Sequence, residues 1–234
     1  MPLIVFSQFA GTSLWFAGNA VMPDLQAVLD LPDTALGNIT SAVQIGFICG
    51  TLVFAFLMLA DRFSPSLVFL ISALLGAVSN VCILFFTPGF VELLAFRFLT
   101  GFFLAGIYPV GMKIAADWYE SGLGKALGYL VGALVLGTAF PHLLKFLARD
   151  YPYQPVLIAT SVLAALGGLS LYLGVGDGPY GRRSLKFDPG AVTRIFSLPD
   201  FRAAAFGYFG HMWELYAFWA YVPVLLMLHL QIGG

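Results

Sequence analysis

The stretch "AFRFLTGFFLAGIYP", residues 95–109, places one arginine in an otherwise apolar run. No acidic residue in the stretch can neutralise Arg97. A charged side chain within a membrane helix is costly, and it usually faces the interior of a helix bundle or a wet cavity. The stretch therefore predicts a membrane-spanning helix whose Arg97 side meets protein or water rather than acyl chains.

The composition of the whole chain also indicates a membrane environment. Of its 234 residues, 60% are hydrophobic and 10% are charged, whereas a soluble domain carries about 25% charged residues. A spanning helix needs about 20 mostly apolar residues. Seven stretches meet this requirement: Leu3–Met22, Leu36–Leu59, Ser66–Phe86, Glu92–Ala115, Gly124–Phe146, Gln154–Gly174 and Ala203–Leu228.

The pattern within these stretches favours helices. Strand alternation with a period of two is absent from the sequence, and helices satisfy every backbone group within lipid. We therefore predict an all-α, polytopic transmembrane bundle with seven spans. Cys49 and Cys82 lie inside predicted spans and read as small core residues. A net charge of −1 gives no indication of a nucleic-acid partner.

The basic residues predict the orientation, because Lys and Arg collect on the cytoplasmic side of short loops. If the even-numbered loops are cytoplasmic, that side holds Arg62, Lys113, Lys125, Arg182, Arg183, Lys186, Arg194 and Arg202. The outer side then holds Lys145 and Arg149, with Arg97 near the outer end of the fourth span. This split predicts an integral multi-pass protein with a cytoplasmic N-terminus, although Lys145 and Arg149 lie on the disfavoured side.

The sixth loop divides the chain, because it is longer and more basic than the others and rich in Gly and Pro. We predict a six-helix transmembrane half over residues 1–176, a cytoplasmic linker over 177–202, and a single helix over 203–234. Such an inventory is typical of half a transporter followed by the first helix of its second half.

Three local patterns carry a resemblance to a known family. The loop "LMLADRFSPS", residues 57–66, resembles the signature G-x-L-A-D-R-x-G-R-R over Leu59–Arg62, although its glycines and basic pair are lost. The run "RFLTGFFLAG", residues 97–106, is similar to R-x-x-x-G-x-x-x-A. The run "YPVGMKIAADWYESGLGKALG", residues 108–128, resembles the passage from span four into span five. In this order, the patterns resemble the major facilitator superfamily of secondary transporters.

The resemblance implies a 3+3 inverted repeat in the first half, followed by the first helix of a truncated second half. The missing second half would be an intramolecular partner, so we expect that the chain does not transport by itself. The family's mechanism is alternating access, with Asp61 and Arg62 as a conformational latch; the alternative for this pair is an ordinary charged helix end. A bacterial inner membrane is the expected location.

Polar stripes on the predicted helices indicate a shared pathway, since positions i, i+4, i+7 and i+11 of a helix lie on one face. In the family, helices one, four and seven line the central pathway, and their stripes carry the ionisable or amide groups. The predicted substrate and proton pathway consists of Asn19, Gln44, Arg97, Tyr108, His211 and Glu214.

Each predicted role has an alternative. Arg97 would attract an anionic group or hold a carboxylate network, but it could also reach the membrane surface or make a structural hydrogen bond. Glu214, tuned by His211, is the candidate for proton coupling, since desolvation raises the pKa of a buried carboxylate; a protonated Glu bonded to another helix is the alternative. Interhelical hydrogen bonds explain Asn19 and Gln44 equally well.

The function predicted from these patterns is secondary active transport of a small solute, with protons as a candidate coupling ion. A self-contained seven-helix receptor or sensor is the alternative, but the seventh span has no lysine for a retinal Schiff base. A membrane enzyme is not expected, because His211 and Glu214 alone provide too few ligands for a metal site. We expect no cofactor, and the substrate and the direction of transport stay open.

Overall fold

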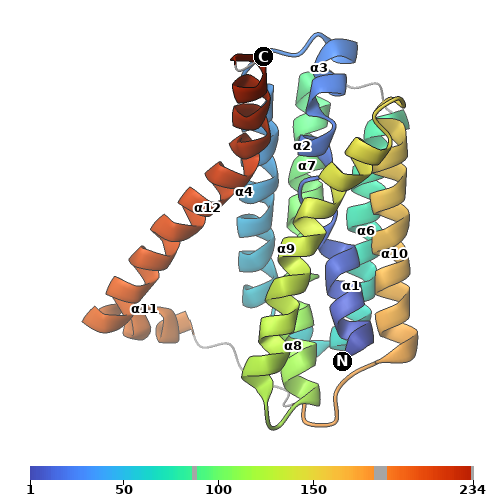
Figure 1. Cartoon of the computed structure of the whole chain (residues 1–234). Coiled ribbons are helices and arrows are strands. Elements are labelled where there is room, and N and C mark those ends of the chain that lie inside the picture. The colour runs from blue at the N-terminus through green and yellow to red at the C-terminus, as the bar shows by residue number, and fades with distance from the viewer. Residues whose placement is uncertain (86–88, 182–188, 233–234) are drawn as a thin grey trace. The chain divides into compact units, whose positions relative to one another are not determined.

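The computed structural model describes residues 1–85, 89–181 and 189–232 (Figure 1). Every regular element over these ranges is a helix. The chain forms two compact units, Met1–Leu185 and Lys186–Gly234. The first unit contains α1 (Pro2–Thr12), α2 (Ala17–Ala20), α3 (Met22–Leu29), α4 (Ala35–Phe56), α5 (Leu59–Arg62), α6 (Pro65–Phe85), α7 (Phe90–Leu104), α8 (Tyr108–Trp118), α9 (Leu123–Leu147) and α10 (Gln154–Gly174). The second contains α11 (Pro189–Ser197) and α12 (Pro199–Ile232).

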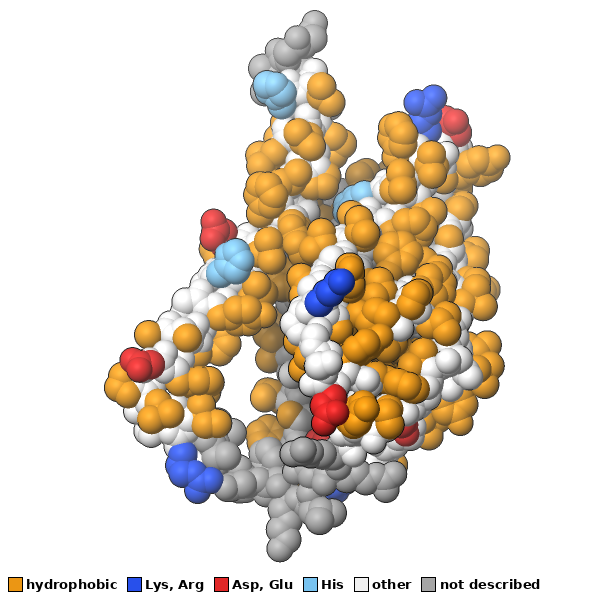
Figure 2. Space-filling view, turned by 60° about the horizontal axis from the view of Figure 1, so that its bottom comes forward, with side chains coloured by type: hydrophobic (Ala, Val, Ile, Leu, Met, Phe, Trp, Pro, Cys, Tyr) orange, Lys and Arg blue, Asp and Glu red, His pale blue; other side chains and the backbone are white. Residues whose placement is uncertain are grey.

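The long helices confirm an all-α, polytopic membrane protein. Within the described ranges, six helices are long and apolar enough to cross a bilayer. Their bounds are Ala35–Phe56, Pro65–Phe85, Phe90–Trp118, Leu123–Leu147, Gln154–Gly174 and Pro199–Leu230. Hydrophobic side chains cover the visible sides of these helices, with few charged groups among them (Figure 2).

The first predicted span differs from the expectation of a continuous helix. In place of one helix over Leu3–Met22, the chain forms α1, then turns over residues 13–16, and continues as α2 and α3. The turns are closed by hydrogen bonds from the Leu14 amide to the Gly11 carbonyl and from the Trp15 amide to the Thr12 carbonyl, at 3.4 and 3.0 Å. The first predicted span is therefore interrupted in its middle.

Small residues let α4 and α7 approach closely. A Cβ atom added at Gly46 would overlap the Phe98 carbonyl oxygen, and one added at Gly101 would overlap the Val43 carbonyl oxygen. Backbone contact of this kind is a common way for membrane helices to associate. It fixes α4 beside α7 and so brings the polar stripes of both helices into the same part of the bundle.

The glycines of α9 behave differently from one another. The sequence predicts that they all serve helix packing, and Gly137 does lie against Thr12 and Phe9 of α1. A Cβ atom at Gly124, Gly128 or Gly132 would meet no described atom within 4 Å. The close packing predicted for these three glycines is therefore not made within the described part of the chain.

The first unit contains all ten described helices from α1 to α10. Figure 1 places the N terminus, the turn between α8 and α9, and the chain that leaves α10 at the same end of this unit. The boundaries at 176 and 202 stay a prediction.

Candidate functional site

The interruption of the first span is held by Arg97 of α7. The guanidinium is fully buried and donates through Nη1 to the Leu14 carbonyl oxygen at 3.3 Å and through Nη2 to the Trp15 carbonyl oxygen. Gly18 lies against the same side chain, since an added Cβ there would be 3.0 Å from Nε of Arg97. A break in a helix frees backbone carbonyl groups, and Arg97 satisfies two of them.

Asn80 of α6 extends this network to a fourth segment. Its Oδ1 atom accepts from Nη1 of Arg97 at 3.3 Å. Its Nδ2 atom donates to Thr160 Oγ1 at 3.2 Å and to Ser161 Oγ at 3.0 Å, both on α10. Arg97 and Asn80 thus join α6, α7 and α10 to the interrupted span through buried hydrogen bonds. The sequence analysis missed Asn80, although an amide within the apolar run Pro65–Phe85 was the available signal.

The burial of Arg97 excludes one of the alternative roles that the sequence allowed. Its exposed fraction is 0%, so the side chain does not reach the membrane surface. Its hydrogen-bond acceptors among the described residues are carbonyl and amide oxygens, which is the structural hydrogen bonding that was one of the predicted alternatives. The role of Arg97 in a pathway stays a prediction.

A second polar group lies where the interrupted span faces α4. Asn19 of α2 donates from Nδ2 to Thr40 Oγ1 at 2.7 Å, and the rings of Trp15 and Phe47 lie 4.7 Å apart. Gln44 falls between Thr40 and Phe47 on the same stripe of α4, four residues after one and three before the other. Asn19, Thr40, Gln44 and the two aromatic rings therefore form one continuous contact zone.

Two polar atoms of this zone are buried without a hydrogen-bond partner in the described residues. They are Oδ1 of Asn19, an acceptor, and Nε2 of Gln44, a donor. Leaving a buried polar group unsatisfied costs about 1–3 kcal/mol. Such groups are expected where a protein binds a polar ligand, so we take this zone as the candidate solute site.

The remaining predicted pathway residues lie elsewhere. Tyr108 is the first residue of α8 and is partly buried in the first unit. His211 and Glu214 belong to the second unit, where both side chains are exposed on α12. Of the four predicted residues in the first unit, the structure brings Asn19 and Gln44 into one contact zone, with Arg97 bonded to the adjoining break.

The first span also buries an amide that the site prediction left out. Gln8 of α1 is fully buried, and neither of its amide atoms has a hydrogen-bond partner among the described residues. It lies against α8, since a Cβ atom added at Gly111 would overlap its Oε1 atom. Gln8 is four residues before Thr12 and eleven before Asn19, so helical spacing puts the three side chains on one face. That spacing was the signal in the sequence.

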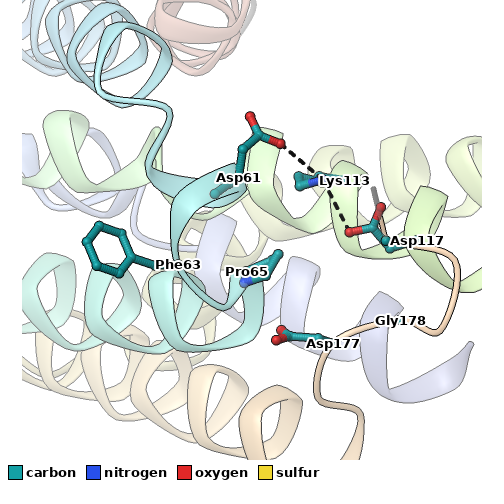
Figure 3. Close-up of a pocket in the computed structure, with 9 residues that line it drawn as sticks. Asp61, Phe63, Pro65, Lys113, Asp117, Asp177 and Gly178 are labelled. Carbon is teal, nitrogen blue, oxygen red and sulfur yellow. Dashed lines mark ion pairs between the residues drawn. The ribbon is translucent and has the colours of Figure 1, made fainter. Parts of the chain in front are cut away.

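A charged cluster lies at the end of the unit where α5 meets α8 (Figure 3). Nζ of Lys113 is 3.3 Å from Oδ1 of Asp61 on α5 and 3.3 Å from Oδ2 of Asp117, one turn further along α8. Of the predicted latch pair, Asp61 makes this interhelical ion pair. Arg62 is exposed and has no ion-pair partner among the described residues.

The chain that follows α10 docks beside this cluster. Asp177 accepts from Ser64 Oγ and from the Ser66 amide, both at 2.9 Å, and so caps the first turn of α6. The Tyr180 amide donates to the Asp117 carbonyl oxygen at 2.9 Å. A cavity of about 180 Å³ lies between these segments, lined by Ala60, Asp61, Phe63, Pro65, Lys113, Asp117, Asp177, Gly178 and Gly181.

Lys113, Asp117 and Asp177, which lie around Asp61, were not among the predicted residues. The i, i+4 spacing of Lys113 and Asp117 was a visible signal for their pair. Their contacts with α5 and with the chain after α10 join residues far apart in sequence, which no local pattern shows.

Lys145 carries an ion pair at a different place in the unit. Its Nζ atom lies 2.6 Å from Oδ2 of Asp24 on α3 and donates to the Tyr151 carbonyl oxygen at 3.1 Å. This lysine, which the topology prediction leaves on the disfavoured side, is thus paired. The orientation itself stays a prediction.

Comparisons with known proteins point to one class. The family model of the Major Facilitator Superfamily matches residues 4–234. Solute carrier family 22 member 6 of Pseudopleuronectes americanus is 30% identical over 115 residues, which are 49% of this chain and 20% of that protein. The niacin transporter NiaP of Acinetobacter baylyi is 34% identical over 111 residues, which are 43% of this chain and 25% of that protein.

A solved structure shares the fold. PepTSo, a POT family transporter crystallised in meso, matches with a TM-score of 0.62 and 19% identity, over 80% of this chain and 39% of that chain. The two curated relatives are matched over a quarter or less of their own length.

Proposed function

Because the chain belongs to the Major Facilitator Superfamily, we propose that it supplies the first six-helix half and the next helix of a secondary transporter. That transporter moves a small solute across the membrane by alternating access, in which two halves rock about a central site. Membership in the family and the transporter relatives support the transport of a small solute across a membrane.

The observation that carries the proposal is the interrupted first span. Transporters of this kind build their binding sites where membrane helices are discontinuous, because freed backbone and side-chain groups can then contact the solute. Here the interruption lies next to the unpartnered atoms of Asn19 and Gln44. We propose that these two amides bind the solute and that Arg97 holds the interruption in shape.

The chemistry of this zone defines a solute class. Oδ1 of Asn19 accepts a hydrogen bond and Nε2 of Gln44 donates one, beside the rings of Trp15 and Phe47, which are tilted by 46°. A small, flat organic molecule with a donor and an acceptor on one edge fits both features. Niacin, which the name of one relative specifies, is a compound to test first.

Binding tests the site directly. We expect the 234-residue chain in detergent to bind a compound from a panel of small organic solutes that includes radiolabelled niacin. Replacing Gln44 by Leu removes one hydrogen bond, so the Kd for that compound rises about fivefold. Asn38→Leu is the matched control, because Asn38 is an exposed amide on the same helix. Equal Kd values for the two variants would remove Gln44 from the site.

Uptake tests the transporter assignment. In proteoliposomes that contain the intact transporter, the compound accumulates against its gradient, whereas the 234-residue chain alone gives none above empty liposomes. Accumulation by the chain alone would contradict the need for a second half.

Proton coupling is a separate part of the proposal. We assign it to Glu214 with His211 one turn before it, and Glu214→Gln in the intact transporter then abolishes uptake driven by a pH gradient while solute exchange continues. Glu120→Gln, an exposed carboxylate of the first unit, serves as the control. Unchanged pH-driven uptake in the Glu214→Gln variant would assign coupling to another group.

A further inference from the structure

The short helix α11 separates polar from apolar residues. Helical spacing puts Thr193 and Ser197 on one side and Ile195 on the opposite side, with Phe196 at the edge between them. The two hydroxyl groups bond to carbonyls of their own helix, Thr193 to Gly190 at 2.9 Å and Ser197 to Arg194 at 2.6 Å. Ile195 is 43% exposed in its unit. The helix therefore presents apolar surface that its own unit does not cover.

The contact between α11 and α12 is made at the edge of this apolar side. The rings of Phe196 and Phe201 meet edge to face, with centroids 5.1 Å apart. Phe201 lies in the first turn of α12, which crosses the membrane. Figure 1 shows α11 running across the lower end of α12, within the same unit. Phe196 thus packs on the first turn of α12, and Ile195 stays exposed beside it.

Basic residues lie where α11 meets α12, and their positive charge attracts anionic lipid. Arg194 lies on α11 and Arg202 in the first turn of α12, with Asp200 between them. The sequence directly before α11 adds Arg182, Arg183 and Lys186, residues outside the described ranges. Basic residues next to a membrane helix are drawn to anionic lipid head groups within about one Debye length.

We propose that α11 is an interfacial helix whose partner is the anionic phospholipid of the membrane leaflet at this end of α12. Ile195, Phe196 and Leu198 enter the boundary between head groups and acyl chains, and Arg194 and Arg202 contact lipid phosphates. A short amphipathic helix with basic flanks binds a bilayer in this manner. This lipid site is distinct from the solute site of the first unit, and it holds the start of α12 at a fixed depth.

Fluorescence from labels on the two sides of α11 tests the proposal. The 234-residue chain, with Cys49 and Cys82 replaced by Ala, carries an environment-sensitive dye after Ile195→Cys, and after Thr193→Cys as the matched control. Both variants are placed in nanodiscs of phosphatidylcholine, with or without phosphatidylglycerol. We expect blue-shifted emission and quenching by brominated lipid at position 195, stronger with phosphatidylglycerol, and water-like emission at position 193.

Each arm has an outcome that overturns the proposal. Equal quenching at the two positions would show that α11 has no lipid-facing side. Blue-shifted emission at position 195 without lipid quenching would show that protein covers it. Adding Arg194→Gln and Arg202→Gln removes the phosphatidylglycerol-dependent part of the quenching; if that part persists, the arginines do not contact lipid phosphates. Retained monodispersity of the variants shows that these signals come from folded protein.

Discussion

Two cations of the first unit, Arg97 and Lys113, are stabilised in opposite ways. Arg97 is 0% exposed in the middle of the bundle, and it donates hydrogen bonds to two backbone carbonyls and an amide oxygen. The Lys113 side chain is 25% exposed at the end of the bundle and pairs with two carboxylates. The same charge thus meets neutral partners inside the membrane region and charged partners at its border.

The difference follows from solvation. A carboxylate beside Arg97 would add a second desolvation penalty in the interior, which the attraction between the charges often fails to repay. Carbonyl dipoles supply the acceptors without that penalty. At the bundle end, water and salt screen each ion pair, so a pair contributes about 0–1 kcal/mol and breaks readily. The Arg97 network therefore suits a permanent framework, and the Lys113 cluster suits a contact that opens and closes.

The largest expected effect comes from Arg97→Met. The variant keeps an apolar stem but leaves the Leu14 and Trp15 carbonyls and Oδ1 of Asn80 without their donor. Buried unsatisfied groups of this kind cost about 1–3 kcal/mol each, so we expect a loss of several kcal/mol in the free energy of unfolding, measured in detergent by thermal or denaturant unfolding. Arg149→Met is the matched control, because the Arg149 side chain is 76% exposed. Equal unfolding midpoints for the two variants would remove Arg97 from the framework.

A double-mutant cycle sharpens this result. Asn80→Leu removes the link from Arg97 to α10, with an expected loss of about 1–3 kcal/mol. Combined with Arg97→Met, it should cost less than the sum of the two single changes, since residues in one hydrogen-bond network couple by about 0.5–3 kcal/mol. Strict additivity in the unfolding free energies would show that the two side chains act independently.

The contrast also shows how far the sequence leads. Hydropathy is a property of contiguous residues, so the six long spans and the all-α class could be predicted from apolar runs. The interruption of the first span could not, because "SLWF", residues 13–16, is as apolar as its surroundings. Its turns are stabilised by Arg97, more than eighty residues away along the chain.

Of the candidate site, too, some residues could be predicted from the sequence and their contacts could not. Asn19 and Gln44 were found from helical periodicity, since a stripe depends on local spacing. Their shared contact zone needed the packing of α2 on α4, and the contacts of Lys113 with α5 needed the packing at the bundle end. Asp177 bonds to Ser64 and Ser66, more than a hundred residues away, so no local pattern revealed it. Asn80 had a local signal, an amide in an apolar run, but its partners on α7 and α10 had none.

Lys113→Gln tests the charged cluster at the end of the bundle. It should change the free energy of unfolding only slightly. It removes both ion pairs of the cluster, and such partly exposed pairs at the end of a bundle contribute about 0–1 kcal/mol each, so the unfolding midpoint stays close to that of the parent. Because Asp61 and Asp117 are no longer held together, we expect the uptake rate of the intact transporter to change by more than stability does. Lys125→Gln, at an exposed position of α9, is the control. A loss of unfolding free energy as large as that of Arg97→Met would show that the cluster stabilises the fold as strongly as the Arg97 network does.

The smallest effect separates the two members of the predicted latch. Arg62 is exposed and has no ion-pair partner in the described ranges, so Arg62→Gln should leave both the unfolding free energy and the uptake rate within error of the parent. Asp61→Asn removes the carboxylate that Lys113 contacts, so it should reproduce the uptake phenotype of Lys113→Gln. Asp61→Asn combined with Lys113→Gln should then change the uptake rate no more than either substitution alone, because both break the contact between Asp61 and Lys113. A larger uptake defect from Arg62→Gln than from Asp61→Asn would move the latch from the α5–α8 contact to a partner of Arg62 elsewhere in the transporter.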